Sequence, residues 1–501
     1  MDNANLYLAY ARKFPPAAVE FLITEEGERY TYSDLAARSA RLAHTLVRHG
    51  LVAGDRLTVQ AEKCPEFIWL YLACLRAGIV FHPLNPAYTT AEVEYFVEDA
   101  APAALIGDAA SIVSLTTLGA RFAVPLINTL DELCQQSTDE SAEFNTIVCA
   151  PATLAALLYS SGTTGKPKGI MLSHHNLATN ARALGEAWGF TQDDVLLHVL
   201  PLFHVHGLFI ALGCTLMSGS RLLFYARFNA QAVLTALPQA SVMMGVPTYY
   251  TRLLAEPGLN AARCRALRLF TCGSAPLLAE TWQAFHARTG QAVLERYGMT
   301  ETSIITTNPL VGERRPGSVG VALGGVEVRV VDNADQPVSA GTAGHVQVRG
   351  PSVFEGYWRK PDKTREDFTV DGFFRTGDDG VLDGAGYLSL VGRAKDLVIT
   401  GGLNVYPSEI EQVLDAESCV LESAVIGLPH PDFGEQVIAV LVLQPNAVWD
   451  EAQVRIRVRE QLAAFKCPKH YRIVSELPRN AMGKVQKNLL RTQGVGQGSS
   501  P

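Results

Sequence analysis

A chain of 501 residues is too long for a single hydrophobic core, so at least two domains are expected. The composition, with 48% hydrophobic and 18% charged residues, is typical of a soluble globular enzyme. The formal net charge of −8 argues against nucleic acid as the main partner, because proteins that bind nucleic acid usually carry a basic face.

The cysteines and the two ends of the chain predict a protein of a reducing compartment. Nine cysteines are scattered along the sequence without a CxxC pair or the Cys/His spacing of a zinc site. The opening MDNANLYLAY lacks the basic segment of a secretory signal, and no apolar run reaches the roughly 18 residues of a membrane span. The final GSSP is not a peroxisomal address. We therefore expect a cytoplasmic protein with no membrane partner.

Helix and strand patterns alternate over the first part of the chain. Residues 30–50 have apolar positions at helical spacing after Ser33, a residue type that favours helix starts, and they end at Gly50. Residues 55–61 (DRLTVQA) are typical of a strand, and residues 65–85 of a helix, a glycine and a strand. The alternation continues to about residue 310 and predicts a layered, largely parallel α/β sheet.

The pattern changes in the last third of the chain. Residues 326–350 contain short β runs separated by Asp, Asn, Gly and Pro, which predict a small subdomain of hairpins. A second change, near residue 394, precedes a glycine pair and a capped helix. The predicted fold class is α/β: a large N-terminal layered α/β domain with a small β subdomain (1–393), a smaller α+β C-terminal domain (394–491) and a disordered tail (492–501).

One polar stretch, LYSSGTTGKPKG at residues 158–169, has the composition of a phosphate-binding loop. It departs from the Walker loop, because Ser160 stands where the first glycine belongs and Pro167 follows Lys166. Its glycines would nevertheless let backbone N–H groups approach an anion, and its hydroxyls and lysines add donors. Composition alone leaves two interpretations open, a phosphate loop and an ordinary flexible loop.

This stretch resembles the signature of the acyl-adenylate-forming superfamily, which includes acyl-CoA synthetases, adenylation domains and firefly-type luciferases. Six further motifs resemble those of the family, in the expected order: PLFHVHG (201–207), CGSAPL (272–277), YGMTE (297–301), FRTGD (374–378), GRAKDLVITGGLNVYPSEIE (392–411) and PRNAMGKVQK (478–487). The resemblance covers nearly the whole chain. It implies that a carboxylate attacks the α-phosphate of ATP to give an acyl-adenylate and pyrophosphate, and that CoA then displaces AMP.

The resemblance implies an ATP site built from several of these motifs. Two anionic reactants require positive charge and a metal, and Mg²⁺ commonly takes only one or two protein carboxylates. Glu301 would hold Mg²⁺, Thr300 would contact the α-phosphate, and Asp378 would accept from the ribose hydroxyls. By composition alone, Glu301 is a solvated glutamate, Tyr297 a core tyrosine and Asp378 a turn residue. The full ATP-binding set implied is Ser161, Gly162, Thr163, Thr164, Gly165, Lys166, Tyr297, Gly298, Asp378 and Arg393, with Lys168 as a further charge that steers ATP.

The resemblance also implies a catalytic lysine and a mobile C-terminal domain. Lys484, by composition only an exposed lysine, matches the family residue that bridges the carboxylate and the α-phosphate, a task that suits a flexible ammonium. In the family the small domain closes over ATP and then rotates for thioester formation, with the hinge at the residue that matches Lys395. Gly401 and Gly402 would line the channel for CoA. The implied cofactor is Mg²⁺, with ATP and CoA as co-substrates.

The choice of acid is expected to depend on residues 243–254 and on the CGSAPL motif. Arg252 follows VPTYY, and a buried guanidinium needs an anionic partner. An Arg252 that faces the pocket therefore implies a second carboxylate on the acid, whereas an Arg252 that faces solvent implies nothing. Ser274 would bond this second carboxylate beside Arg252. The resemblance places His204 at the acyl pocket, although a lone histidine is more often a core residue and a metal site would lack a third ligand.

The sequence of the whole chain is similar to that of the malonyl-CoA synthetase branch of the family, for example in the segments AVLERYGMTET (292–302), ESAVIGLPHPDFGE (422–435) and LPRNAMGKVQKN (477–488). We therefore predict an ATP-dependent malonate–CoA ligase that forms malonyl-CoA through malonyl-AMP, with methylmalonate as a related substrate. The alternatives are a CoA ligase for another short or medium carboxylic acid, an adenylation enzyme that loads a carrier protein, and a luciferase-like or non-catalytic relative. The presence of Lys484, Glu301, Asp378 and Arg393 argues against a non-catalytic relative. The sequence leaves the oligomeric state open.

Overall fold

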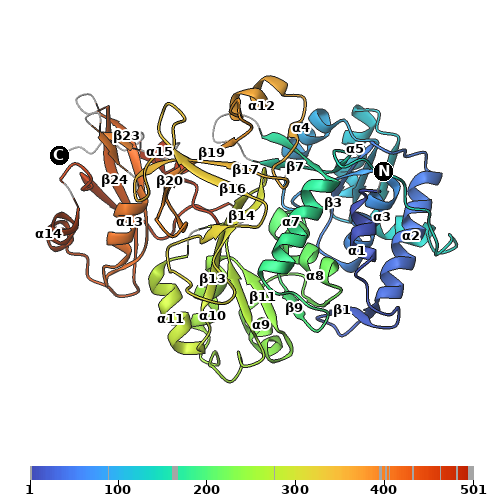
Figure 1. Ribbon diagram of the computed structural model, residues 1–501, viewed down its shortest axis with the longest axis horizontal. Coiled ribbons are helices and arrows are strands. Elements are labelled where there is room, and N and C mark those ends of the chain that lie inside the picture. The colour runs from blue at the N-terminus through green and yellow to red at the C-terminus, as the bar shows by residue number, and fades with distance from the viewer. Residues whose placement is uncertain are drawn as a thin grey trace.

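The computed structural model describes residues 3–88, 90–160, 167–275, 277–393, 398–400, 403–405, 407–430, 434–462, 464–480 and 483–494. It is a mixed α/β protein in which a large N-terminal part lies beside a smaller C-terminal part (Figure 1). The predicted fold class is confirmed. No helix in the described part of the chain combines the length and the hydropathy needed to cross a membrane.

The first large sheet has seven strands. Its order is β18 (Gly356–Tyr357), β8 (Lys168–Ser173), β7 (Leu154–Ser160), β4 (Val80–Pro83), β3 (Arg56–Gln60), β5 (Ala104–Gly107) and β6 (Leu126–Thr129). The strands from β7 to β6 are parallel, and β8 and β18 are antiparallel additions at one edge. The helices of this region are α1 (Leu6–Ala11), α2 (Tyr32–Arg48), α3 (Pro65–Ala77), α4 (Thr90–Ala100), α5 (Ile112–Arg121) and α6 (Leu130–Gln136).

Local sequence explains the first helices of this sheet. The cap of α2 is Thr31 rather than the predicted Ser33, because Thr31 and Asp34 form a reciprocal capping box at the helix start. In α3, Pro65 occupies the first turn, where its missing N–H costs nothing, and Gly78 ends the helix at φ +69°. All sides of α3 from Phe67 onward are buried, which agrees with its nearly continuous apolar sequence.

The second large sheet has nine strands and carries most of the candidate site. Its order is β15 (Val321–Ala322), β14 (Ser303–Thr307), β13 (Val293–Met299), β12 (Leu269–Cys272), β11 (Val242–Gly245), β9 (Val195–His198), β10 (Arg221–Phe224), β1 (Glu20–Thr24) and β2 (Arg29–Thr31). The strands from β13 to β1 are parallel, as the alternating pattern predicts. Its helical elements are α7 (His174–Ala187), the π-helix η1 (His206–Ala211), α8 (Leu212–Ser218), α9 (Ala230–Ala236), η2 (Leu237–Gln239), α10 (Pro247–Ala255) and α11 (Ala279–Thr289).

The two large sheets share one internal helical layer. Helix α7 contacts β8 of the first sheet and β14 of the second, and it also packs against α1 and α8. Its capping residue Asn176 donates from its side chain to the carbonyls of Pro351 and Val353, both at 2.9 Å. The start of α7 therefore ties both large sheets to the segment that leads into β18.

Two smaller sheets complete the chain. The predicted β subdomain is an antiparallel sheet of β16 (Glu327–Val331), β17 (Ala343–Arg349), β19 (Phe374–Leu382) and β20 (Leu388–Arg393), with α12 (Pro361–Asp367) inserted before β19. The last sheet has the order β22 (Leu403–Val405), β21 (Val398–Thr400), β24 (Gly434–Leu443) and β23 (Val420–His430), with β25 (His470–Ile473) also paired to β24. Helices α13 (Pro407–Asp415), α14 (Glu451–Gln461) and α15 (Lys487–Gly494) accompany this sheet, so α15 continues past the predicted start of the tail at residue 492.

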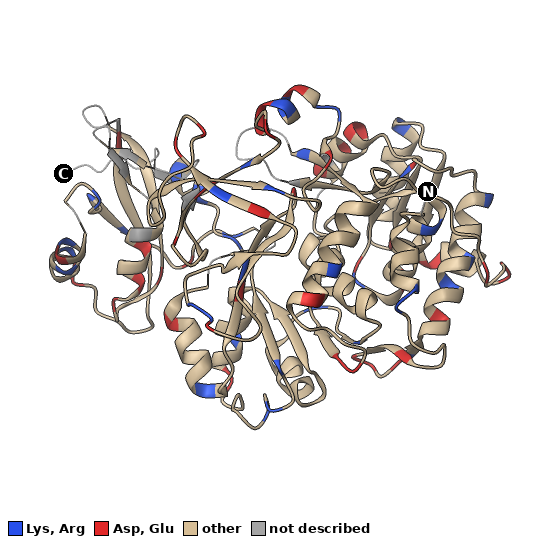
Figure 2. Cartoon of the chain, in the orientation of Figure 1, with Lys and Arg blue, Asp and Glu red and all other residues tan. Residues whose placement is uncertain are grey.

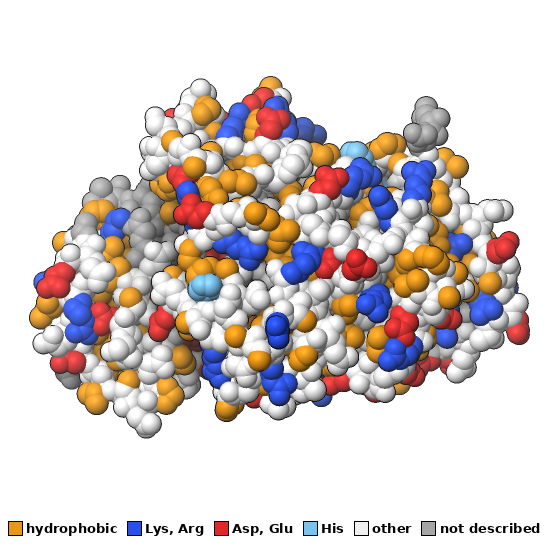
Figure 3. Space-filling view, turned by 60° about the horizontal axis from the view of Figure 1, so that its bottom comes forward, with side chains coloured by type: hydrophobic (Ala, Val, Ile, Leu, Met, Phe, Trp, Pro, Cys, Tyr) orange, Lys and Arg blue, Asp and Glu red, His pale blue; other side chains and the backbone are white. Residues whose placement is uncertain are grey.

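Charged side chains of both signs are distributed over the chain (Figure 2). The face in Figure 3 likewise carries interspersed positive, negative and apolar side chains. All nine cysteines are free thiols, as their scattered positions predict.

Candidate active site

The predicted phosphate stretch connects two antiparallel strands. Ser160 at the end of β7 is the register partner of Lys168 at the start of β8, and the predicted phosphate contacts at residues 161–166 lie outside the described residues. The ammonium of Lys168 lies 4.3 Å from the centre of the Tyr357 ring and 3.9 Å from Oδ2 of Asp367. Lys168 is therefore held by β18 and α12, and is not the mobile charge that its sequence context suggests.

The structure brings together Tyr297 and Asp378, two members of the predicted ATP-binding set. Tyr297 on β13 donates its hydroxyl to Oδ2 of Asp378 on β19 across 2.5 Å, and both side chains are buried. The backbone N–H of Asp378 donates to Oγ1 of Thr376 at 3.1 Å. Arg393 is the register partner of Asp378 on β20, and its side chain lies outside the described residues. A carboxylate so placed can accept from a sugar hydroxyl at the junction of two sheets.

The YGMTE motif adopts its shape because of Gly298. The register of β13 with β14 shifts between Tyr297 and Gly298, and a Cβ at position 298 would lie 2.0 Å from the carbonyl oxygen of Ser303. Thr300 and Glu301 follow in a tight turn. Glu301 is buried, with 5% of its surface exposed, and its carbonyl accepts from the N–H of Phe354 at 2.8 Å. The glycine thus directs the chain so that the carboxylate of Glu301 enters the interior.

The surroundings of Glu301 fit a magnesium ion. Burial raises the pKa of Tyr357, and the charges of Glu301 and Asp367 raise it further, so this ring lies near Glu301 as well as Lys168. Within the described ranges no group of three or more His, Cys, Asp or Glu side chains could hold a metal ion by themselves. One buried carboxylate is nevertheless the protein contribution that Mg²⁺ typically needs when phosphate oxygens and water supply the other ligands.

The predicted catalytic lysine lies on a tight turn of the C-terminal part. The N–H of Asn480 donates to the carbonyl of Lys484 at 2.9 Å, and the N–H of Lys484 donates to Oδ1 of Asn480 at 3.0 Å. Gly483 makes the turn possible with φ +75°, and a Cβ there would lie 3.5 Å from Oγ1 of Thr248 in the first turn of α10. The turn of Lys484 therefore lies near the carboxyl end of β11, an inner strand of the nine-stranded sheet. Three predicted hinge and channel residues lie outside the described residues: Lys395, Gly401 and Gly402.

The predicted second-carboxylate contact, Arg252, faces solvent, whereas another arginine is buried beside the predicted acyl-binding residues. Arg252 is exposed on α10, so the argument from a buried guanidinium does not apply to it. Arg296 on β13 is 5% exposed, and its Nε and Nη2 have no hydrogen-bond partner among the residues that the structure describes. A Cβ at Gly273 would come within 2.3–2.6 Å of the guanidinium, so only glycine leaves room for it. Sequence reasoning missed Arg296, although an arginine inside the apolar strand AVLERYGM was a signal.

Two histidines and a serine share the environment of Arg296. Oγ of Ser274 lies 3.3 Å from Nδ1 of His206, and the N–H of His206 donates to Nδ1 of His204 at 3.2 Å. Burial, and then the charge of Arg296, lower the pKa of His204 to about 4 and that of His206 well below its usual value. Nε2 of His206 is buried, and no described residue forms a hydrogen bond with it. The structure thus places the predicted His204 and Ser274 beside a buried cation and neutral polar groups, an arrangement that suits an anion.

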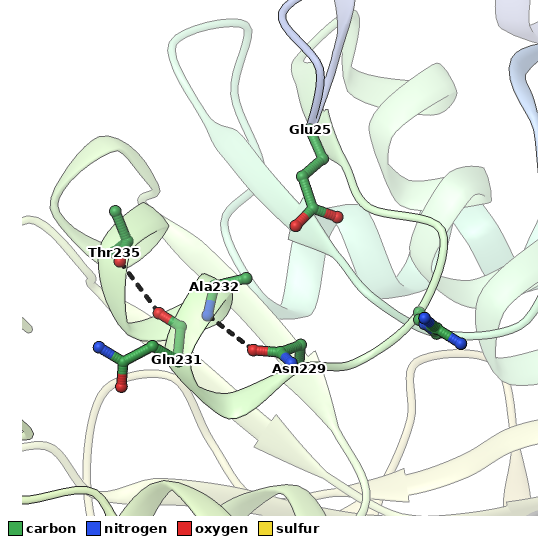
Figure 4. Close-up of a pocket in the computed structure, with 6 residues that line it drawn as sticks. Glu25, Asn229, Gln231, Ala232 and Thr235 are labelled. Atoms are coloured by element: carbon green, nitrogen blue, oxygen red, sulfur yellow. Dashed lines mark hydrogen bonds between the residues drawn. The ribbon is translucent and has the colours of Figure 1, made fainter.

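A separate surface depression of about 430 Å³ contains none of the predicted site residues. It is lined by Glu25, Arg227, Asn229, Gln231, Ala232 and Thr235. In Figure 4, Oδ1 of Asn229 accepts from the N–H of Ala232 at 2.9 Å and the hydroxyl of Thr235 donates to the carbonyl of Gln231 at 3.0 Å. Because one acidic and one basic side chain line it, the depression does not offer the concentrated positive charge that ATP requires.

Known protein families identify the class of the chain. The AMP-binding enzyme family matches residues 9–358, and the AMP-binding enzyme C-terminal domain matches residues 409–484. The chain belongs to this acyl-adenylate-forming family. It is an AMP-forming acyl-CoA synthetase, which uses ATP, CoA and a carboxylic acid.

The similar proteins include ligases that join CoA to small acids. A mitochondrial malonate–CoA ligase of Mus musculus is 35% identical over 515 residues, covering 94% of this chain and 88% of that protein. A sulfoacetate–CoA ligase of Cupriavidus necator is 34% identical over 478 residues, covering 93% of each. The crystal structure of ATP-bound MatB from Rhodopseudomonas palustris is 48% identical, with a TM-score of 0.96 over 98% of this chain and 99% of that one. The apo form of the same protein gives a TM-score of 0.86.

Proposed function

We propose that this CoA ligase acts on malonate and forms malonyl-CoA through malonyl-AMP. The observation that carries the proposal is Arg296, a buried guanidinium with two nitrogens that form no hydrogen bond within the described part of the chain. The similarity to malonate–CoA ligases supports the same acid. Methylmalonate, which differs by one methyl group, is the related substrate to compare.

The energetics of Arg296 favour an acid with a second anionic group. A desolvated cation without a partner costs several kcal/mol, and an anion that pairs with it removes much of that cost. The distal carboxylate of malonate would supply this partner, with Ser274 and His206 as neutral neighbours. A monocarboxylate of similar size would leave the guanidinium unpaired, so the pocket would discriminate against it.

The remaining site residues fit the two half-reactions. The reacting carboxylate would approach the α-phosphate next to Lys484 and Thr300, while Tyr297 and Asp378 hold the nucleoside. Glu301 would hold Mg²⁺, which when bound supplies positive charge to the phosphates. The contacts of residues 161–166 and Arg393 with ATP, the hinge at Lys395, the CoA channel at Gly401 and Gly402, and a cytoplasmic location stay predictions.

The test compares Arg296→Met with Arg252→Ala as the matched control, because both variants remove an arginine and only one of these arginines is buried. Pyrophosphate release and thioester mass are followed with malonate, methylmalonate, acetate and butyrate. We expect Arg296→Met to lower kcat/KM for malonate about 100-fold, roughly 2.7 kcal/mol, and to spare acetate and butyrate. Arg252→Ala should remain within about threefold of the wild type. Retention of malonate activity by Arg296→Met would contradict the assignment.

Sulfoacetate is the second candidate acid. Its sulfonate occupies the place of the distal carboxylate of malonate, so Arg296 would pair with either anion, and a sulfoacetate–CoA ligase is among the relatives. The same assay with sulfoacetate added to the acids decides between them: a kcat/KM for sulfoacetate above that for malonate would replace malonate as the substrate while leaving the role of Arg296 intact.

A further inference from the structure

Lys63 makes an unusual set of buried contacts near the proposed acid pocket, which is formed by Arg296, His204, His206 and Ser274. It lies between β3 and α3, and its ammonium is 2.9 Å from Nδ1 of His198, 2.9 Å from the carbonyl of His198 and 2.6 Å from the carbonyl of Tyr225. The same ammonium lies 4.4 Å from the centre of the Phe224 ring. Burial lowers the pKa of Lys63, yet three acceptors match the three N–H donors of its protonated form.

The hydrogen bonds of His198 determine its tautomer. His198 is 1% exposed at the end of β9, and its Nε2 lies 2.9 Å from the carbonyl of Gly207. A carbonyl only accepts, so Nε2 carries the proton. Nδ1 of the neutral ring is then an acceptor, which agrees with Lys63 as its donor. The result is a directed chain of donors from Lys63 through His198 to Gly207.

Gly207 joins this series of hydrogen bonds to the acid pocket. It is the second residue of the π-helix η1, directly after His206, and single π turns are frequent at functional sites. A Cβ at position 207 would lie 2.0 Å from the carbonyl of Pro201, so the turn closes tightly on itself. A displacement of the Gly207 carbonyl would therefore also move His204 and His206, which flank Arg296.

We propose that Lys63 and His198 are positioning residues for the acid: they hold the turn of residues 201–207 so that His204 and His206 stay against Arg296. This inference rests on the proposed function of that pocket. Neither residue belongs to the proposed ATP site, so their loss should change recognition of the acid and leave recognition of ATP nearly unchanged.

A matched pair of substitutions at His198 tests the hydrogen bonds that run from Lys63 through His198 to Gly207. In His198→Gln the amide nitrogen replaces Nε2 and can still donate to Gly207, whereas in His198→Asn the amide oxygen replaces Nδ1 and the bond to Gly207 is lost. We expect His198→Asn and Lys63→Met to raise the KM for malonate about tenfold or more, and His198→Gln to stay within about threefold. The KM for ATP should stay within about twofold in all three. Lys13→Met, at an exposed lysine, is the control.

The inference is overturned if the KM for ATP rises as much as the KM for malonate, if His198→Gln and His198→Asn behave alike, or if the KM for malonate is unchanged throughout. Circular dichroism and thermal unfolding establish that each variant is folded. If His198→Asn does not fold, His198→Gln still decides, because a tenfold higher KM for malonate in a folded variant that keeps the Gly207 bond contradicts the inference. A wild type without malonate activity would instead refute the proposed function, and the variants would then be compared with the acid that the wild type uses.

Discussion

Tyr297 and Asp378 join the nine-stranded sheet to the four-stranded sheet through one hydrogen bond of 2.5 Å between phenol and carboxylate. We predict that Tyr297→Phe raises the KM for ATP about three- to tenfold, because it removes a bond of about 1 kcal/mol that orients the proposed ribose acceptor. Asp378→Asn should raise it further, because it weakens the acceptor itself. Pyrophosphate release at saturating acid measures both effects. A KM for malonate that changed equally would show that the pair supports the fold as a whole.

Arg479 braces the turn of Lys484. Its Nη1 donates to the carbonyl of Gly483 at 2.6 Å, and its guanidinium pairs with Glu422. We predict that Arg479→Met slows adenylate formation about tenfold, and Lys484→Ala more than about 100-fold, while thioester formation from supplied malonyl-AMP persists. Arg457→Met, which breaks the Arg457–Glu417 pair in the same part of the chain, should leave both half-reactions intact. Equal losses in both half-reactions would contradict the role of the turn.

Glu295 makes stability depend on pH. Burial raises its pKa to about 7, although the N–H of Gly317 donates to it at 3.0 Å. A carboxyl with a raised pKa in the folded state stabilises the fold at low pH, and this contribution is lost as the pH rises through about 7. Glu295→Gln should therefore gain stability relative to the wild type between about pH 5 and 8.5, by on the order of 1–3 kcal/mol. Thermal unfolding at both pH values measures the gap. A gap that does not change with pH, or that also appears in Glu280→Gln at the exposed surface, would refute this assignment.

Two glycines give opposite predictions for the same substitution. Gly298→Ala places a Cβ 2.0 Å from a backbone oxygen, so the bulge must shift and carry Tyr297 and Glu301 with it. We expect a loss of more than about tenfold in kcat/KM for ATP and a lower melting temperature. In Gly185→Ala of α7 the new Cβ would meet no atom of the described residues within 4 Å, so this variant should stabilise the protein by about 0.5–1 kcal/mol without changing activity. Similar activities of the two variants would contradict the constraint at Gly298.

The fold was largely predictable, and the candidate ATP-site residues could be named from the sequence, because both depend on local signals. Periodicity located the strands and helices of the two large sheets, and short motifs carried Tyr297, Glu301 and Asp378. The cap of α2 was placed two residues too late because both Thr31 and Ser33 are good capping residues, and only the bond to Asp34 distinguishes them.

The acid pocket was harder because burial of an arginine depends on distant segments. Arg296 is enclosed by Gly273, directly after the neighbouring strand β12, and by the turn before η1, which periodicity does not relate to β13. Arg252 lies on a helix with one apolar face, and its orientation depends on which face packs against the sheet. Sequence therefore predicted a buried arginine near the acid and named Arg252, whereas the three-dimensional packing buries Arg296.

The carbonyl of Glu301 accepts from the N–H of Phe354, a residue far from it in sequence, and this separation has a consequence for folding. The proposed metal ligand, ribose acceptor and lysine come from segments far apart in sequence, and such contacts form late because long loops must close first. An N-terminal fragment that ends before β19 would keep most of the buried core and still lack Asp378 and Lys484. During refolding we therefore expect adenylation activity to return after the helical circular dichroism signal, because molecules that lack the contacts between distant segments lack the complete site.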